Sequence, residues 1–186
     1  ISGGPLVTAI GDYDGAIYTD IKKSSPRHTP IIGTTESMAY APLSRTLLRT
    51  GVITKYYTYE SKNFNVMYRS EDLGQTWDSV KTELKGGKGL VVLSADGKVI
   101  LHRPDQSATV YRSDDNGATW TAVETGTQTQ YARIVADPVD TKTFYVMGSM
   151  GTLYKSTDAG KNFTAQEARL QNEGAGEYYN GAGLIR

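Results

Sequence analysis

Short runs of alternating or continuous apolar residues predict β-strands along most of the chain. The runs are four or five residues long and are bounded by Gly, Pro, Asp or Ser, which favour turns. The clearest of them span residues 90–93, 98–101, 132–136 and 143–147. Such runs, together with the high content of Gly and Tyr, are typical of an all-β protein with antiparallel strands.

A twelve-residue pattern occurs three times along the chain. Each copy contains an apolar residue, Tyr, a basic residue, Ser, Asp, Gly and a final Trp or Phe. The copies span residues 66–77, 109–120 and 152–163, and their serines are 43 residues apart each time. This is the Asp-box (BNR) signature, and its spacing falls within the roughly 40–45 residues of one four-stranded propeller blade.

The conserved positions of this pattern have a structural explanation. We call residues 70–77, 113–120 and 156–163 the Asp-box turns. Their Ser and Asp side chains can satisfy turn amides, their Gly tolerates positive φ, and their aromatic residue can close the turn onto the sheet. We therefore expect these aspartates to hold the turns and not to catalyse a reaction.

The repeat predicts a single β-propeller segment over residues 1–186, built of four-stranded antiparallel blades. Blade units are expected at roughly 1–34, 35–85, 86–128 and 129–172, with the start of a further blade at 173–186. In the first unit a long loop rich in Pro and Ser replaces the Asp-box turn. About four blades are fewer than most closed propellers contain. The ring is therefore expected to be incomplete, and the chain, which begins with Ile1, to be a piece of a longer protein.

Composition and charge argue against several kinds of partner and cofactor. Twenty basic residues balance twenty acidic ones, which favours neither nucleic acid nor an anionic membrane as a partner. No apolar run reaches the roughly 20 residues of a membrane-spanning helix. The chain has no Cys, and its two histidines, His28 and His102, have no second ligand at metal-binding spacing. We expect no metal and no cofactor.

The most informative segment outside the repeats is Gly11-Asp12-Tyr13-Asp14-Gly15. It places two carboxylates in a tight turn beside an apolar strand. Asp and Gly are frequent in turns without any catalytic role, so an ordinary Asp-Gly turn is one interpretation. The other interpretation is a catalytic and sugar-binding turn, in which Tyr13 offers an aromatic ring to a sugar.

This segment, together with the Asp-box units and Asp137-Pro138, resembles the second propeller of family 74 glycoside hydrolases. These enzymes are xyloglucanases and oligoxyloglucan reducing-end-specific cellobiohydrolases. The resemblance implies a secreted protein with two facing propellers of about seven blades each, which bind a β-1,4-glucan in the cleft and supply one catalytic Asp each. Asp12 matches the catalytic position of the second propeller. Ala16 stands where the family commonly has an aromatic residue.

Hydrolysis with inversion needs two carboxyl groups, because one protonates the departing glycosidic oxygen while the other activates water. Asp12 cannot do both, and the Asp of the first propeller has no counterpart in this chain. Asp14 is too near Asp12 to act across a sugar, so we expect it to assist substrate binding as a turn ligand or a tuning charge. The chain alone is expected to be catalytically weak or inactive.

Tyrosines are the remaining candidates for sugar platforms, because both tryptophans belong to Asp-box turns. Tyr13 lies next to Asp12 in the sequence. The run Tyr56-Tyr57-Thr58-Tyr59 alternates like a strand, which would direct one face toward a sugar and the other toward the core.

Two other classes of protein also contain Asp-box propellers. Sialidases need an arginine triad, and the arginines of this chain are scattered without an Arg-Ile-Pro motif. Non-catalytic propellers, such as sortilin-type receptor domains and photosystem assembly factors, use the disc to bind a protein or a carbohydrate. Such a binding module is the alternative to a fragment or subunit of a glycoside hydrolase.

Overall fold

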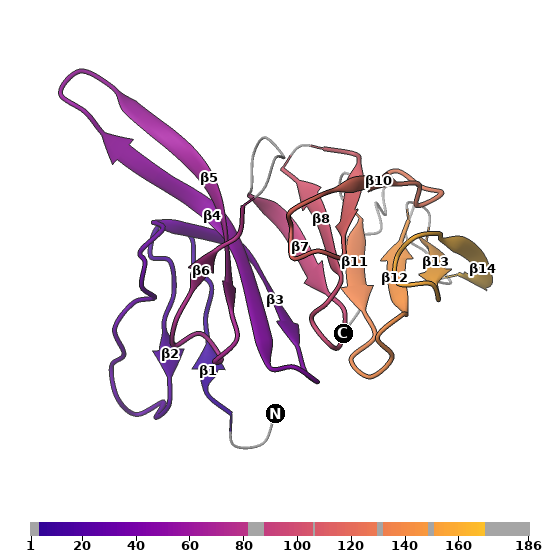
Figure 1. The fold of residues 1–186 in the computed structure, drawn as a ribbon, viewed down its shortest axis with the longest axis horizontal. Coiled ribbons are helices and arrows are strands. Elements are labelled where there is room, and N and C mark those ends of the chain that lie inside the picture. Colours follow the sequence, from indigo (N-terminus) through magenta and orange to yellow (C-terminus); the bar gives the residue numbers. More distant parts are fainter. Residues whose placement is uncertain (1–3, 82–87, 106, 130–131, 149–150, 170–186) are drawn as a thin grey trace, which may run out of the picture.

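The computed structural model describes residues 4–81, 88–105, 107–129, 132–148 and 151–169. In these residues it contains fourteen strands, all paired antiparallel, arranged as three four-stranded sheets and one two-stranded sheet. The sheets follow one another in chain order and stand side by side (Figure 1). The predicted all-β class and the partial propeller architecture are confirmed. The expected start of a further blade at 173–186 lies outside the described residues.

The first unit is the smallest. Its strands β1 (Leu6–Val7) and β2 (Ile17–Tyr18) form a two-stranded sheet. Isolated bridges at Ile10↔Asp14 and Ala16↔Arg27 extend the pairing into the neighbouring loops. Between residues 4 and 33, the described part of this unit, there is no third or fourth strand, and a long loop follows β2.

The second unit is a four-stranded sheet in which one hairpin is much longer than the rest. It consists of β3 (Thr34–Ala41), β4 (Thr46–Tyr56), β5 (Ser61–Ser70) and β6 (Asp78–Ser79), in the order β3-β4-β5-β6. Pairing of β3 with β4 ends at Thr34↔Val52, whereas pairing of β4 with β5 continues to Tyr56↔Ser61. The end of the hairpin therefore projects beyond the sheet (Figure 1).

The Tyr56–Tyr59 run is not a strand with a buried face, so that expectation was wrong. Tyr56 is the last residue of β4, and the amide of Tyr57 donates to the carbonyl of Glu60 across the hairpin turn, 2.7 Å. Tyr56, Tyr57 and Tyr59 are all exposed. Alternation does not indicate burial here, because no other part of the described chain packs on the turn.

The third and fourth units repeat one plan. Their strands are β7 (Gly89–Leu93), β8 (Ile100–Pro104), β9 (Val110–Ser113) and β10 (Thr121–Val123), then β11 (Arg133–Ala136), β12 (Phe144–Met147), β13 (Thr152–Ser156) and β14 (Thr164–Arg169). Each sheet pairs its strands in chain order. Residues 90–93, 132–136 and 143–147, expected as strands, lie in or at the ends of β7, β11 and β12. The exact boundaries of the blade units stay a prediction.

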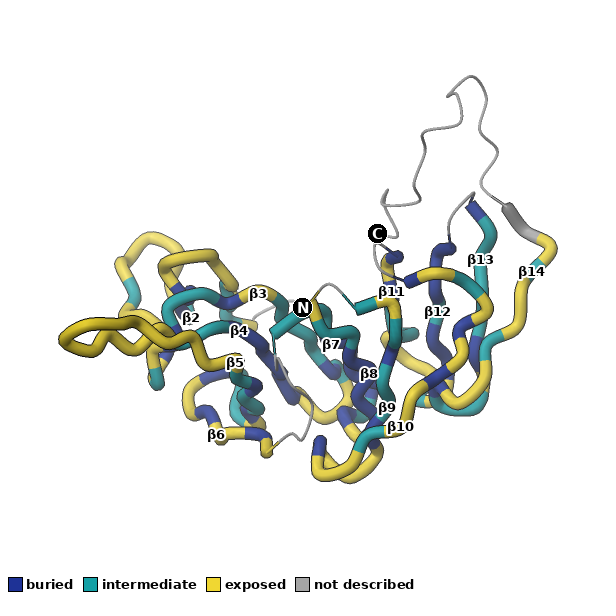
Figure 2. The backbone as a smooth tube through the Cα atoms, turned by 90° about the horizontal axis from the view of Figure 1, so that it is seen from above, coloured by how far each residue is buried: buried dark blue, intermediate teal, exposed yellow. Residues whose placement is uncertain are grey.

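The hydrophobic core lies between neighbouring sheets. Leu48, Met67 and Val91 belong to a cluster between the second and third units, whereas Val92 and Phe144 belong to a cluster between the third and fourth. Successive residues of β7 thus enter different clusters, because side chains alternate across a strand. A blade buried on both faces needs apolar residues on both, which explains the continuous run in β7 (Figure 2).

The three Asp-box turns share one hydrogen-bond pattern. At the second of them, the Ser113 hydroxyl accepts from the Gly117 amide, 2.8 Å, and donates to Asp115, 2.7 Å. Asp115 also accepts from the amide of Thr119, 2.9 Å. The residue before each Gly has positive φ, as do the glycines themselves. Each turn joins the third strand of its sheet to the fourth, as expected for a structural clip.

Candidate active site

The Asp12 turn, residues 10–16, connects β1 to β2 through a left-handed backbone. The φ angles are 59° at Asp12 and 70° at Asp14, a conformation that Asp tolerates better than most residues. Gly15 follows with φ 121°, and a Cβ there would lie 1.9 Å from the Thr8 carbonyl oxygen. Only Gly fits at this position, so the backbone of the turn is sterically defined.

The Asp12 carboxylate is exposed and lightly bonded. The Asp12 amide donates to the Thr34 hydroxyl, 3.2 Å, and this hydroxyl approaches the carboxylate at 3.4 Å. Thr34 is the first residue of β3, so the sheet holds the backbone of the turn while most of the carboxylate faces solvent. Such a group can donate or accept a proton at a bound ligand.

Tyr13 presents its ring beside Asp12 at the tip of the turn. It is 68% exposed, which leaves room for a sugar. The Arg27 guanidinium lies 6.0 Å from the ring centroid, at the outer limit of a cation–π contact. The structure therefore brings Asp12 and Tyr13 together on one exposed turn. Whether Tyr13 contacts a substrate stays a prediction.

Asp14 has the opposite environment, because it is fully buried. Its carboxylate accepts from Arg49, 2.6 Å, from the Thr35 hydroxyl, 2.6 Å, and from the Ile32 amide, 3.1 Å. These contacts are those of a turn ligand, one of the two roles expected for it. Direct contact with a substrate is untested, and the burial of Asp14 favours an indirect role.

Arg49 on β4 is the site residue that the sequence analysis missed. It is fully buried, and besides Asp14 it donates to the Pro30 carbonyl, 2.8 Å. Its guanidinium lies 4.4 Å from the centroid of the Trp77 ring, so the first Asp-box turn packs onto it. Burial lowers the pKa of Arg49, and the charge of Asp14 opposes that shift. The available signal was a charged residue directly after the apolar pair Leu47-Leu48.

His28 completes this buried cluster. Its Nε2 lies 2.9 Å from the Thr8 carbonyl, and its ring meets the Trp77 ring edge-on, with centroids 5.5 Å apart. Burial lowers the pKa of His28, which favours the neutral imidazole. Among the described residues, no group of three or more His, Asp or Glu side chains could hold a metal ion. His28 is therefore a packing residue behind the Asp12 turn.

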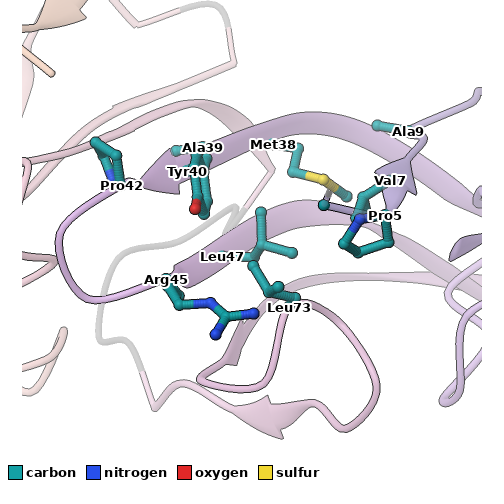
Figure 3. A pocket seen from close by; sticks show the side chains of 11 residues that line it. Pro5, Val7, Ala9, Met38, Ala39, Tyr40, Pro42, Arg45, Leu47 and Leu73 are labelled. Atoms are coloured by element: carbon teal, nitrogen blue, oxygen red, sulfur yellow. The ribbon is translucent and has the colours of Figure 1, made fainter. Parts of the chain in front are cut away.

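A cavity of about 890 Å³ lies on the first four-stranded sheet (Figure 3). Its lining is mostly apolar and comes from the N-terminal segment, β3, the start of β4 and the first Asp-box turn. The lining residues include Pro5, Val7, Met38, Tyr40, Leu47 and Leu73. Neither Asp12 nor Tyr13 lines it, so it is a sheet face that β1 covers only in part.

Three features define the class of protein as a β-propeller: the strand order, the hydrophobic clusters between neighbouring sheets, and the repeated turns. The chain forms part of such a propeller. The family model described as Sortilin-Vps10 (sortilin, neurotensin receptor 3) matches residues 108–178, less than half of the chain. In the described part of the chain, no helix has the length and apolarity to cross a bilayer.

Three proteins similar to this chain indicate which kind of β-propeller it resembles. The chain is 30% identical over 109 residues to a xyloglucanase of Acetivibrio thermocellus, covering 57% of this chain and 12% of that protein. A family 74 glycoside hydrolase of Niastella koreensis has a TM-score of 0.76 and 34% identity, covering 91% of this chain and 23% of that one. A family 74 xyloglucanase of Xanthomonas campestris has a TM-score of 0.76 and 26% identity, covering 91% and 24%.

These findings confirm that the chain resembles part of a propeller of family 74 glycoside hydrolases, as its sequence indicates. The chain spans about an eighth of the curated relative's length and about a quarter of each solved structure.

Proposed function

We propose that the chain is part of the second propeller of a secreted glycoside hydrolase that cleaves β-1,4-glucan backbones such as xyloglucan with inversion. In this proposal Asp12 is one of the two catalytic carboxyl groups. The observation that carries it is the open Asp12 carboxylate on a sterically defined turn, in a chain that is 34% identical to a family 74 enzyme.

In the proposed reaction, one carboxyl group acts as the general acid and another acts as the general base. Inverting hydrolases keep these groups about 6.5–9.5 Å apart, so that a water molecule fits between one of them and the sugar. Asp14 does not suit the second role, because its carboxylate is buried against Arg49. The second group would come from the other propeller. Within that cleft Asp12 would transfer the proton, and Tyr13 would stack on a neighbouring sugar ring.

The remaining partners follow from this proposal. Blades outside this chain and a second propeller would complete the cleft, and the glucan would be the substrate. Proton transfer between carboxyl groups and water needs no metal or cofactor. Neither nucleic acid nor a membrane is proposed as a partner.

Exchange of Asp12 tests the proposal. In the complete enzyme, Asp12→Asn should lower the release of reducing ends from xyloglucan about a hundred- to ten-thousand-fold, because the amide cannot transfer a proton. Asp114→Asn is a matched control, since Asp114 is exposed at a variable position of an Asp-box turn, and this variant should keep its activity. Full activity of Asp12→Asn would exclude the catalytic role.

A second candidate function is a non-catalytic binding propeller. The match of residues 108–178 to the sortilin-type family model favours it, because this region contains two of the three Asp-box turns and not Asp12. In that case the complete protein would not hydrolyse glucans, and Asp12→Asn would leave binding of its ligand unchanged.

A further inference from the structure

We propose that the projecting end of the β4–β5 hairpin, residues 53–64, is a carbohydrate-binding arm that holds the glucan chain at a distance from the cleaved bond. We call this segment the hairpin arm. The inference rests on the proposed function and adds to it a second site of contact with the same substrate.

The hairpin arm begins beside the Asp12 turn. Thr34 accepts the hydrogen bond of the Asp12 amide and is paired with Val52, so the arm leaves the sheet at the level of Asp12. Gly51 lies against the same segment, since a Cβ there would come within 2.0 Å of the Thr34 carbonyl oxygen. Arg49 precedes Gly51 by two residues and therefore lies on the same face of β4. Its guanidinium donates a hydrogen bond to Asp14. The arm and the candidate catalytic turn therefore share one edge of the blade.

The end of the hairpin arm carries exposed aromatic rings. Tyr56 is 83% exposed and Tyr59 is 97% exposed. Exposure of this extent leaves both faces of each ring open, and no described residue stacks on either ring. Exposed tyrosine rings offer an apolar face that a ligand can cover and a hydroxyl that can form a hydrogen bond. Their positions fit a ligand with flat, partly apolar faces, such as the pyranose rings of a glucan.

The two other rings on the arm each lie near a lysine. The Lys55 ammonium lies 5.2 Å from the centroid of the Phe64 ring, and that of Lys62 lies 5.8 Å from the centroid of the Tyr57 ring. Lys62 also pairs with Glu60, 3.0 Å. These contacts tie the two strands of the arm together. Tyr56 and Tyr59 are therefore the two most exposed rings of the arm.

The polar surface of the arm favours a carbohydrate over a protein partner. The Thr54 hydroxyl bonds the Asn63 side chain, 2.8 Å, and both residues are exposed. Hydroxyl and amide groups of this kind can bond sugar hydroxyls. Lysines, which the arm carries at two positions, are depleted from the cores of protein–protein interfaces, whereas tyrosines are enriched there. A protein contact remains an outcome that the experiment distinguishes.

The reach of the arm defines which part of the substrate it would hold. Tyr56 is four residues beyond Val52 on an extended strand, which corresponds to about 13 Å. A sugar stacked on Tyr56 is therefore not the one whose bond is cleaved next to Asp12. Loss of the rings should weaken binding of long chains and leave the chemical step unchanged.

The experiment compares substrates of two lengths. In the complete enzyme carrying Asp12→Asn to prevent cleavage, calorimetry measures binding of cellotriose and cellohexaose with and without Tyr56→Ala and Tyr59→Ala together. We expect about tenfold weaker binding of cellohexaose and unchanged binding of cellotriose. Thr58→Ala, between the two tyrosines, is the matched control and should bind both sugars as before. On an active background the double variant should raise KM for xyloglucan and keep kcat.

Several results would overturn the hairpin arm as a sugar site. They are unchanged binding of cellohexaose, an equal loss for both sugars, or a lower oligomeric state of the double variant in analytical ultracentrifugation, which would indicate a protein contact. The two proposals can fail separately. If Asp12→Asn remains active while the tyrosine double variant raises KM for xyloglucan at unchanged kcat, the assignment of the arm is supported and the catalytic assignment of Asp12 is excluded. If Asp12→Asn is inactive while the tyrosine variant binds cellohexaose normally, the arm is not a sugar site, and the catalytic role of Asp12 is supported.

Discussion

The Asp12 turn and the Asp-box turns both hold an aspartate, but they leave its carboxylate in opposite situations. Asp115 receives hydrogen bonds from the Ser113 hydroxyl, 2.7 Å, and from the amide and hydroxyl of Thr119 at 2.9 and 2.5 Å. Among the described residues, the Asp12 carboxylate has one hydrogen-bond contact, with the Thr34 hydroxyl at 3.4 Å. A carboxylate that accepts several hydrogen bonds from its own turn stabilises that turn. A carboxylate with few hydrogen bonds that faces solvent is available for proton transfer.

The same contrast exists within the first unit, two residues apart. Asp14 is buried and bonded by Arg49, Thr35 and the Ile32 amide, while Asp12 is exposed. The buried carboxylate fixes the turn that presents the exposed one. The first unit has thus lost the Asp-box turn and holds its loop through a buried ion pair instead.

The largest effect on stability is expected from breaking this ion pair. Arg49→Met should lower the free energy of unfolding by about 3–5 kcal/mol, because it leaves the Asp14 charge buried without a partner. Urea unfolding measures the change. Adding Asp14→Asn to this variant should recover part of the loss, since the uncompensated charge is then removed.

A surface ion pair serves as the control for this prediction. Lys23 and Asp20 are 3.6 Å apart and exposed, so Lys23→Met should change the free energy of unfolding by no more than about 0.5 kcal/mol. If Arg49→Met costs no more than Lys23→Met, the buried pair does not hold the Asp12 turn.

A smaller effect is expected from the pH dependence of an Asp-box turn. The Thr119 and Ser113 hydrogen bonds lower the pKa of Asp115 to about 2, below the roughly 3.9 of an unfolded chain. The folded state therefore binds fewer protons, and the stabilisation is complete above about pH 4 and is lost as the pH falls toward 2. Asp115→Asn removes this contribution.

Unfolding curves over this acidic range measure the difference between the wild type and Asp115→Asn. The difference should shrink as the pH falls from about 4 to about 2. A difference that stays constant would mean that the turn does not depend on the charge of Asp115. Glucan hydrolysis at neutral pH should be the same for both proteins.

The sequence predicts the blades well because their signals are local. The 43-residue spacing of Ser70, Ser113 and Ser156 and the apolar runs between them are sufficient for the class of fold. The support of the candidate site depends on residues far apart in the chain. Asp14 meets Arg49 after 35 residues, and Arg49 meets Trp77 from the next turn, so no local pattern reveals either contact.

The hairpin arm was beyond prediction for a different reason. The run of residues 56–59 has a pattern that a half-buried strand could also have. In the structure, the pairing of β4 with β5 continues beyond the last pair of β3 with β4, and Tyr56 and Tyr59 are exposed there. Register and strand length depend on pairing between segments, which alternation within one segment does not define.

The central claim is that Asp12, in contrast to the Asp-box aspartates and to Asp14, is the carboxyl group that reaches the substrate. A crystal structure of the complete Asp12→Asn enzyme with an uncleaved xyloglucan oligosaccharide tests it most directly. The account predicts the side chain of residue 12 within hydrogen-bond distance of the scissile oxygen or of a water at the anomeric carbon, with a second carboxyl group about 6.5–9.5 Å away. An oligosaccharide bound elsewhere on the propeller, with residue 12 facing bulk solvent, would contradict it.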